Sequence, residues 1–216
     1  LLCQKAENLF VGMNCGIMDQ YIVSLGKKGH VLLIDCRSLR YELVPLPDGV
    51  SLVICNTRKR RGLVDSEYNT RRAECEKGSA ALGVKALRDV TAEQLEARKG
   101  ELDPVTYRRC RHVVTEDART IEAVAAMRSG DLARLGALMN ASHISLRDDY
   151  QVSCFELDMM VEAAWKQPGV YGARMTGGGF GGCAVALVAD EQAAAFAATV
   201  APIYKQATGI DGEIYI

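Results

Sequence analysis

The order of apolar and polar positions divides the chain into two parts. Residues 1–48 predict a short helix followed by strands, and residues 49–216 open with a run of aliphatic side chains at 50–56. Prolines and a glycine interrupt the pattern at 45–49, as is typical of a boundary between domains. We therefore predict that residues 1–48 are the end of one domain and that residues 49–216 form a second domain.

The first part predicts one helix and three strands. Residues 3–10 are expected to be helical, and the glycines at 26–29 predict a turn. The expected strands, which are rich in apolar and β-branched side chains, lie at 21–25, 30–35 and 39–46.

The second part predicts a block of helices between strands. The aliphatic run 50–56 does not alternate, which predicts a strand buried on both faces. The elements expected after it are helices at 65–82 and 104–127, a helix from Asp131 into residues 142–150, a helix between Ser153 and Pro168, strands at 170–175 and 183–189, a helix at 190–208 and a strand at 213–216. This segregation predicts an α+β fold with helices packed on a mainly antiparallel sheet.

Three of these helices begin with side chains suited to capping. Asp103 stands directly before Pro104, and Asp131 precedes an apolar stripe, so both are predicted N-caps. Ser153 and Glu156 have the spacing of a capping box.

Three polar groups leave function open. His112, Glu116 and Arg119 share one helix face, and a satisfied polar stripe is favoured over a functional group. The polar stretch 142–150 is compatible with a pocket wall or an interhelical hydrogen-bond network, and its density favours the network. The basic loop 56–62 is equally compatible with phosphate attraction and with a solvated loop.

Composition excludes several classes of protein. Hydrophobic residues make up 49% and charged residues 25%, and the formal net charge is −1, so neither a nucleic acid nor an anionic membrane is an expected partner. No apolar run approaches the roughly 20 residues needed to span a bilayer, and no signal peptide opens the sequence. We expect a cytoplasmic protein.

The eight cysteines are scattered and include no C-x-x-C pair. This spacing argues against a zinc site, and several of the thiols stand inside apolar runs, where cysteine acts as a small hydrophobe. We expect free thiols in a reducing compartment. The chain starts at Leu1 rather than at methionine and ends within an expected strand, so we expect it to be part of a longer protein.

A glycine and an acid stand out in the stretch 13–20, Met-Asn-Cys-Gly-Ile-Met-Asp-Gln. Gly16 permits backbone conformations that other residues avoid, and Asp19 lies between apolar neighbours. A carboxylate at the mouth of a pocket can accept a proton from a substrate hydroxyl. The alternative is a helix N-cap or turn aspartate, which is the common use of an aspartate after a glycine.

A second distinctive stretch holds five glycines within six positions, and these are Gly177, Gly178, Gly179, Gly181 and Gly182. A backbone without side chains can come close to another group and direct its N–H donors at an anion. The spacing is neither G-x-G-x-x-G nor the Walker A pattern. The alternative is a loop packed tightly against another backbone.

Four motifs, at 15–20, 66–72, 142–150 and 174–182, occur in the order found in one family. Together they resemble the galactokinases of the GHMP small-molecule kinase family, close to the animal type. The resemblance covers essentially the whole chain as the C-terminal half or more of such a protein. It implies the C-terminal end of a GHMP N-terminal domain followed by a ferredoxin-like C-terminal domain.

The resemblance also implies an activity and roles for single residues. The expected reaction is ATP-dependent phosphorylation of galactose at the anomeric hydroxyl to galactose 1-phosphate, by a monomer. Asp19 matches the catalytic aspartate, which acts as base or electrostatic anchor, and Gly16 matches a glycine whose backbone meets the sugar. Tyr68 matches a tyrosine that contacts a galactose hydroxyl. The loop Gly177 to Gly182 matches the glycine motif that supports the phosphate end.

Two family motifs are not found in these residues. They are the sugar-binding motif with an arginine beside the catalytic acid and the serine-rich loop that holds ATP phosphates and Mg²⁺. We expect both upstream of residue 1, so no metal ligand is assigned here and the stretch alone is expected to be inactive. The alternatives are an N-acetylgalactosamine kinase and a non-catalytic galactose-sensing regulator. The sequence Cys-Gly-Ile-Met at 15–18 favours galactose over N-acetylgalactosamine as the substrate.

Overall fold

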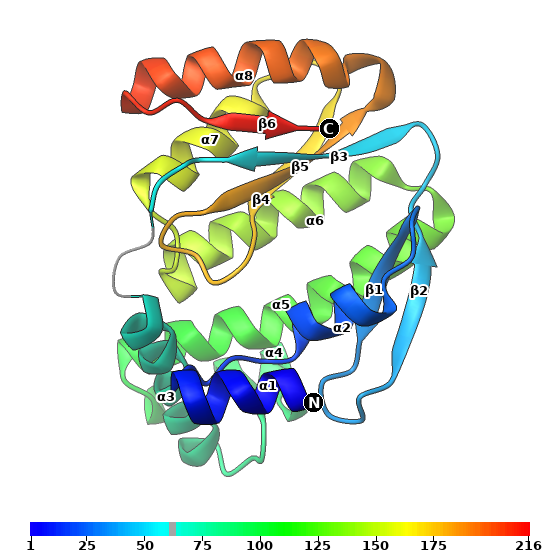
Figure 1. Ribbon diagram of the computed structural model, residues 1–216. Coiled ribbons are helices and arrows are strands. Elements are labelled where there is room, and N and C mark those ends of the chain that lie inside the picture. Colours follow the sequence, from blue (N-terminus) through cyan, green and yellow to red (C-terminus); the bar gives the residue numbers. More distant parts are fainter. Residues whose placement is uncertain (61–63) are drawn as a thin grey trace.

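The computed structural model describes residues 1–60 and 64–216, and Figure 1 shows its arrangement. The helices are α1 (Leu2–Ala6), the π-helical turn η1 (Glu7–Val11), α2 (Met18–Leu25), α3 (Val64–Ala81), η2 (Leu87–Asp89), α4 (Ala92–Ala97), η3 (Lys99–Glu101), α5 (Pro104–Ser129), α6 (Leu132–Ser145), the π-helical turn η4 (Leu146–Tyr150), α7 (Phe155–Trp165), η5 (Asp190–Gln192) and α8 (Ala193–Thr208). The strands are β1 (His30–Ile34), β2 (Tyr41–Pro45), β3 (Val50–Asn56), β4 (Val170–Met175), β5 (Cys183–Ala189) and β6 (Glu213–Tyr215). These elements confirm the expected α+β class.

Strands β1 and β2 form an antiparallel hairpin at one side of the molecule (Figure 1). Val44 of β2 is fully buried, and the hairpin packs against α5. The predicted strand at 21–25 is wrong, because these residues belong to α2. A five-residue apolar run has no periodicity that separates a strand from one and a half helical turns.

The second sheet has the strand order β4-β5-β3-β6, and every neighbouring pair is antiparallel. In chain order this is the βαββαβ arrangement of a ferredoxin-like fold, with the helices from α3 to α7 in the first crossover and α8 in the second. Helices α7 and α8 pack with the sheet in the largest buried cluster. The sheet confirms the mainly antiparallel arrangement expected from the sequence.

Strand β3 is buried on one face, so the expectation of burial on both faces is wrong. Val53 and Cys55 are fully buried under α7 and α8, whereas Leu52 and Ile54, on the opposite face, are 39% and 38% exposed. The absence of alternation reflects aliphatic side chains on a partly exposed face, which composition does not distinguish from a covered one.

Helix α6 crosses the edge strand β4 in direct backbone contact at Gly136 and Gly172. A Cβ on Gly136 would lie 2.0 Å from the Tyr171 carbonyl oxygen, and a Cβ on Gly172 would lie 2.2 Å from that of Gly136. Such backbone contact is possible only with glycine at both positions. It fixes α6 over the strand that leads into the glycine loop.

Two of the three predicted caps are confirmed. Asp103 accepts hydrogen bonds from the Val105 and Thr106 N–H groups, and Asp131 accepts one from Arg134 N–H. The predicted capping box at Ser153 is wrong: α7 begins one residue later. The Ser153 hydroxyl instead donates to Asp158 at 2.5 Å.

The polar face of α5 forms the network favoured by the sequence. Glu116 accepts hydrogen bonds from Arg119 at 2.7 Å, from Arg174 at 3.3 Å and from the Ser142 hydroxyl. Burial raises the pKa of Glu116, but the Ser142 hydrogen bond and the two arginine charges outweigh it and hold the pKa below its ordinary value. The stretch 142–150 therefore serves mainly as an interhelical network.

His112 belongs to the same network and makes stability depend on pH. Its Nδ1 lies 3.0 Å from the Ser145 hydroxyl, and burial lowers its pKa to about 4. Below about pH 6.5 the unfolded chain binds a proton that the folded chain excludes until about pH 4, so stability falls as the pH falls. Between pH 7 and pH 5 this loss is about 2 kcal/mol.

We therefore expect His112→Gln to flatten the pH dependence of the unfolding free energy. Urea titrations of wild type and variant at pH 7, 6 and 5 measure the difference. Parallel losses in the two proteins would contradict the assignment to His112, even if the variant is less stable at every pH.

The cysteines and the hydropathy of the helices can be described for residues 1–60 and 64–216. All eight cysteines are free thiols, and Cys55 and Cys110 are fully buried. Across residues 1–60 and 64–216, none of the helices has both the length and the hydropathy needed to cross a bilayer.

Candidate functional site

A cavity of about 690 Å³ lies where α2, α3 and the β4–β5 loop meet. It brings together Gly16 and Asp19 from the start of the chain, Tyr68 from α3, and Gly177 and Gly178 from the glycine loop. The remaining lining residues are Glu7, Met13, Cys15, Met18, Gln20, Thr176 and Cys183. Residues about 160 positions apart in the sequence thus share one site.

Asp19 lies in the first turn of α2, and its side chain is exposed toward the cavity. A carboxylate in a first turn is stabilised by the positive end of the helix dipole. Ile17, which precedes the helix, is 5% exposed and anchors this turn. Within the described part of the chain no donor hydrogen-bonds to the Asp19 carboxylate, so it is available to a ligand.

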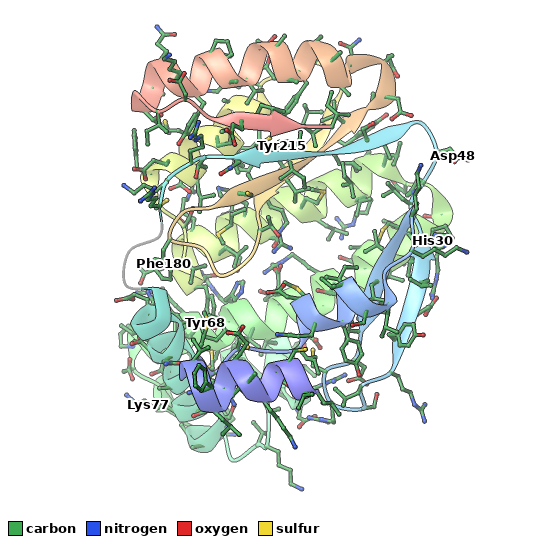
Figure 2. All side chains as sticks on the ribbon, in the orientation of Figure 1. His30, Asp48, Tyr68, Lys77, Phe180 and Tyr215 are labelled. Carbon is green, nitrogen blue, oxygen red and sulfur yellow. The ribbon has the colours of Figure 1, made fainter. Side chains whose placement is uncertain are left out.

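Tyr68 stands one turn into α3, where Figure 2 marks it. It lines the main cavity and also a smaller one of about 170 Å³, which is bounded by Arg71, Tyr150 and Phe180 among others. The structure describes no partner for its hydroxyl among the residues it covers. The Tyr68 side chain therefore separates the two cavities, and, among the described residues, its hydroxyl is free to bind a ligand.

On one side, the glycine loop packs directly against the backbone of other segments. Gly179 and Gly181 have left-handed φ angles of +84° and +128°. A Cβ on Gly179 would lie 2.1 Å from the Val152 carbonyl oxygen, and a Cβ on Gly181 would lie 2.8 Å from that of Lys59. For these two glycines the alternative reading, tight packing against another backbone, is the observed one.

The other side of the loop faces the cavity. Gly178 has no left-handed φ, and a Cβ built on it would meet only the Tyr68 ring, at 3.8 Å. In the part of the chain that the structure describes, the N–H groups of Gly177 and Gly178 donate to no protein acceptor. Paired N–H donors at the edge of a cavity form a site suited to an anion. The Gly182 N–H, in contrast, donates to the Lys59 carbonyl at 3.4 Å, and the Gly182 carbonyl accepts from Thr57 N–H at 3.0 Å.

The sequence reasoning missed several lining residues. Glu7 lies in η1 and Cys183 is the first residue of β5. Neither residue stands in a sequence pattern that indicates a site. Thr176, which begins the glycine loop, could have been found from its position in the motif.

Residues 56–60, the described part of the basic loop, do not line the cavity. Lys59 pairs with Glu156 at 2.6 Å and Arg58 with Glu213 at 3.3 Å, so both cations form ion pairs within the chain. Residues 61–62 of this loop lie outside the described residues. Among the residues that are described, no three His, Cys, Asp or Glu side chains gather as a metal ion would require.

Residues 123–204 match the family model described as GHMP kinases C terminal. The structure of Lactococcus lactis galactokinase complexed with galactose is similar over 99% of this chain, with 41% identity and a TM-score of 0.95. This chain spans 57% of the length of that protein, somewhat more than half.

Two other solved structures are similar at lower identity. L. major mevalonate kinase, in complex with R-mevalonate, has 25% identity and a TM-score of 0.52, over 81% of this chain and 45% of its own. Homoserine kinase from Cytophaga hutchinsonii has 15% identity and a TM-score of 0.50, over 92% of this chain and 54% of its own, and shows the fold alone.

Proposed function

Because the chain belongs to the GHMP kinase family, we propose that the longer protein uses ATP to phosphorylate galactose at the anomeric hydroxyl, giving galactose 1-phosphate. The likeness to a galactokinase over 99% of the chain supports this substrate. The protein acts as a monomer in the cytoplasm, where eight free thiols stay reduced. Residues 1–216 alone, which span 57% of the similar galactokinase, are inactive.

The observation that carries the proposal is the composition of the cavity. Asp19, whose carboxylate accepts no hydrogen bond from the described residues, lines the same cavity as Gly177 and Gly178, whose N–H groups donate to no acceptor among those residues. Phosphoryl transfer to a hydroxyl needs these two functions, one group for the hydroxyl proton and fixed donors for the phosphate charge.

Each group has a role that follows from its chemistry. Asp19 accepts the proton of the anomeric hydroxyl or anchors it electrostatically, and the Gly16 backbone lies beside the sugar. The N–H groups at Gly177 and Gly178 hold phosphate oxygens of ATP. When bound, Mg²⁺ neutralises charge on the phosphates, and we assign none of its ligands to the described residues.

The experiment is a substrate panel with the full-length protein. We expect ATP-dependent formation of a sugar 1-phosphate from galactose, with much lower rates for glucose and N-acetylgalactosamine. Preference for N-acetylgalactosamine would assign the protein to that substrate. Galactose binding without any turnover would instead identify a galactose-sensing regulator.

Tyr68 is the residue that we expect to determine selectivity for the sugar. Its side chain lines the cavity and its hydroxyl has no hydrogen-bond partner among the described residues, so a sugar hydroxyl can bind it. Loss of one matched hydrogen bond costs about 1–3 kcal/mol, which corresponds to a roughly 5- to 150-fold loss of selectivity. Tyr68→Phe should therefore lower the galactose-to-glucose ratio of kcat/KM while the KM for ATP changes little. An unaltered ratio would return Tyr68 to the class of packing residues.

A further inference from the structure

Helix α3 contacts both walls of the candidate cavity. One wall is the segment 13–19, which carries Gly16 and Asp19, and the other is the glycine loop. Tyr68, Arg71 and Arg72 have the spacing i, i+3 and i+4, which places them on one face of the helix. The two arginines extend from this face to different walls.

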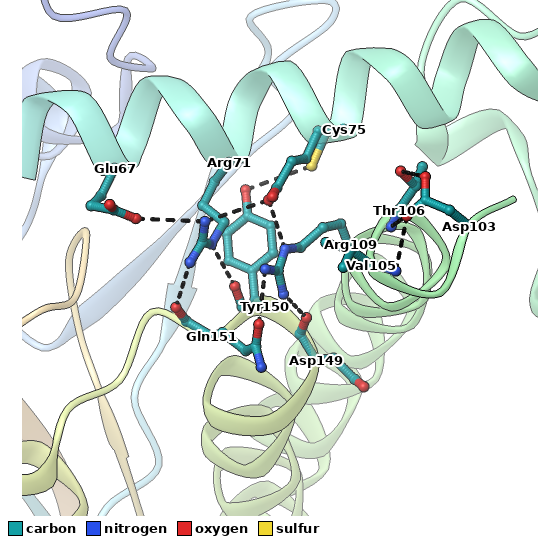
Figure 3. A network of polar contacts seen from close by, with 11 residues as sticks. Glu67, Arg71, Cys75, Asp103, Val105, Thr106, Arg109, Asp149, Tyr150 and Gln151 are labelled. Atoms are coloured by element: carbon teal, nitrogen blue, oxygen red, sulfur yellow. Dashed lines mark hydrogen bonds and ion pairs between the residues drawn. The ribbon is translucent and has the colours of Figure 1, made fainter.

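Arg71 holds the segment that follows η4. Its Nε donates to the Tyr150 carbonyl at 2.8 Å and its Nη2 donates to the Gln151 carbonyl at 2.9 Å, as Figure 3 shows. The side chain is 12% exposed, and Glu74 lies 3.5 Å from Nη1. One guanidinium therefore binds two consecutive carbonyls, which matches its planar fork.

This segment in turn holds the glycine loop. Phe180 N–H donates to the Val152 carbonyl at 2.7 Å, and the same carbonyl closes off the space beside Gly179. The Arg71 guanidinium also lies 5.9 Å from the centre of the Phe180 ring. Arg71 is thus connected to the loop through Val152 and through the ring.

The contact between the segment after η4 and the glycine loop contains two residues in a backbone conformation that residues with side chains disfavour. Gln151 has a φ of +56° and Phe180 a φ of +57°, and neither is glycine. Such conformations persist where the surrounding contacts determine them, and they concentrate at functional sites. Arg109, which is 3% exposed, adds a second support by donating to the Gln151 side-chain oxygen at 2.9 Å.

Arg72 reaches the opposite wall. Its Nη1 donates to the Asn14 carbonyl at 3.0 Å, while its Nε pairs with Glu76 at 3.0 Å. Asn69, on the same helix, accepts from Asn14 N–H at 3.3 Å. Both polar groups of the Asn14 backbone are therefore bound to α3, two residues before Gly16 and five before Asp19.

We propose that Arg71 and Arg72 are positioning residues that set the distance between the acid-bearing wall and the glycine loop. Arg71 aligns the phosphate side and Arg72 aligns the sugar side, and α3 is the common support. The kinetic part of this inference rests on the proposed function. Neither arginine touches the reacting atoms.

The test uses Arg71→Met and Arg72→Met in the full-length protein. Methionine keeps the apolar stem and removes the donors. Loss of a hydrogen bond from a charged donor corresponds to about a tenfold change in a binding or kinetic constant. We expect Arg71→Met to raise the KM for ATP about tenfold with the KM for galactose nearly constant, and Arg72→Met to do the reverse. Arg71→Lys should recover little, because an ammonium lacks the fork.

Hydrogen exchange provides a readout that needs no substrate. Arg71→Met should speed exchange at residues 176–183 and leave 13–19 unchanged, and Arg72→Met should show the opposite pattern. If the wild type does not phosphorylate galactose, the proposed function fails while this pattern still tests the positioning role.

Arg98, which follows α4 and binds the C-terminal end of α3, offers a matched control. It also donates to two consecutive carbonyls, those of Leu82 at 2.7 Å and Ala81 at 3.3 Å, but it does not line the cavity. Arg98→Met should change neither KM nor exchange at the two walls. The proposal is overturned if Arg71→Met and Arg72→Met lower the Tm without a wall-specific pattern, or if Arg98→Met gives the same pattern.

Discussion

Replacement of Asp19 by alanine in the full-length protein should lower the turnover of galactose by about a hundred- to ten-thousandfold, the range attributed to a positioned acid or base. The fold should stay intact, because the Asp19 side chain is exposed and makes no hydrogen bond within the described residues. Its helix-terminal position stabilises α2 by only about 0.3–1 kcal/mol. Steady-state kinetics and a thermal melt on the same preparation measure both quantities.

Asp19→Asn refines this prediction. The amide fills the same space but carries no charge and takes no proton, so turnover should fall nearly as far as in the alanine variant. Asp48, an exposed acid in the turn before β3, is a matched control outside the cavity, and Asp48→Asn should leave turnover unchanged. Near-normal turnover in Asp19→Asn would remove Asp19 from the catalytic role.

The second large effect separates the two sides of the glycine loop. Gly178→Val places its side chain toward Tyr68 in the cavity wall, where only an ordinary contact at 3.8 Å is met. The fold should tolerate it, but phosphate groups should lose their approach to the loop backbone. A misplacement of about 1 Å can cost about a hundredfold, so we expect at least a tenfold rise in the KM for ATP.

Gly179→Ala should act in the opposite way. A Cβ there would lie 2.1 Å from the Val152 carbonyl oxygen, and the φ of +84° is left-handed. The left-handed conformation costs about 1–2 kcal/mol and overpacking costs about 1–3 kcal/mol. The sum is a large fraction of the free energy of unfolding of a domain. We expect a marked fall in Tm. Equal losses of Tm in the two variants, with the KM for ATP unchanged in Gly178→Val, would mean that the whole loop only packs.

The sequence predicts those features of the fold that depend on local chemistry. The N-caps at Asp103 and Asp131 and the strands on either side of the glycine loop follow from capping and β-propensity, and the structure has them. The helix at 18–25 was expected to be partly a strand, because a short apolar run has no distinguishing period. Burial of β3 depends on which face the helices cover, which is a tertiary property.

The candidate site shows the same division. Gly16, Asp19, Tyr68 and the glycine loop were singled out from motifs, and the structure places most of them around one cavity. Their roles stay predictions. The glycines separate into packed and cavity-facing ones only when Val152 and Lys59, which are distant in sequence, come close. No local pattern records that proximity.

The order of strands in the larger sheet has a consequence for synthesis on the ribosome. Its central pair joins β3 to β5, and a hydrogen bond links Ser51 to Asp190 across 139 positions. At about 5–20 residues per second, 139 positions take roughly 7 to 28 seconds, so β3 is made that long before its main partner exists. During that time Val53 and Cys55 have no sheet or helix to cover them. The newly made chain is therefore most dependent on chaperones before α7, β5 and α8 have been translated.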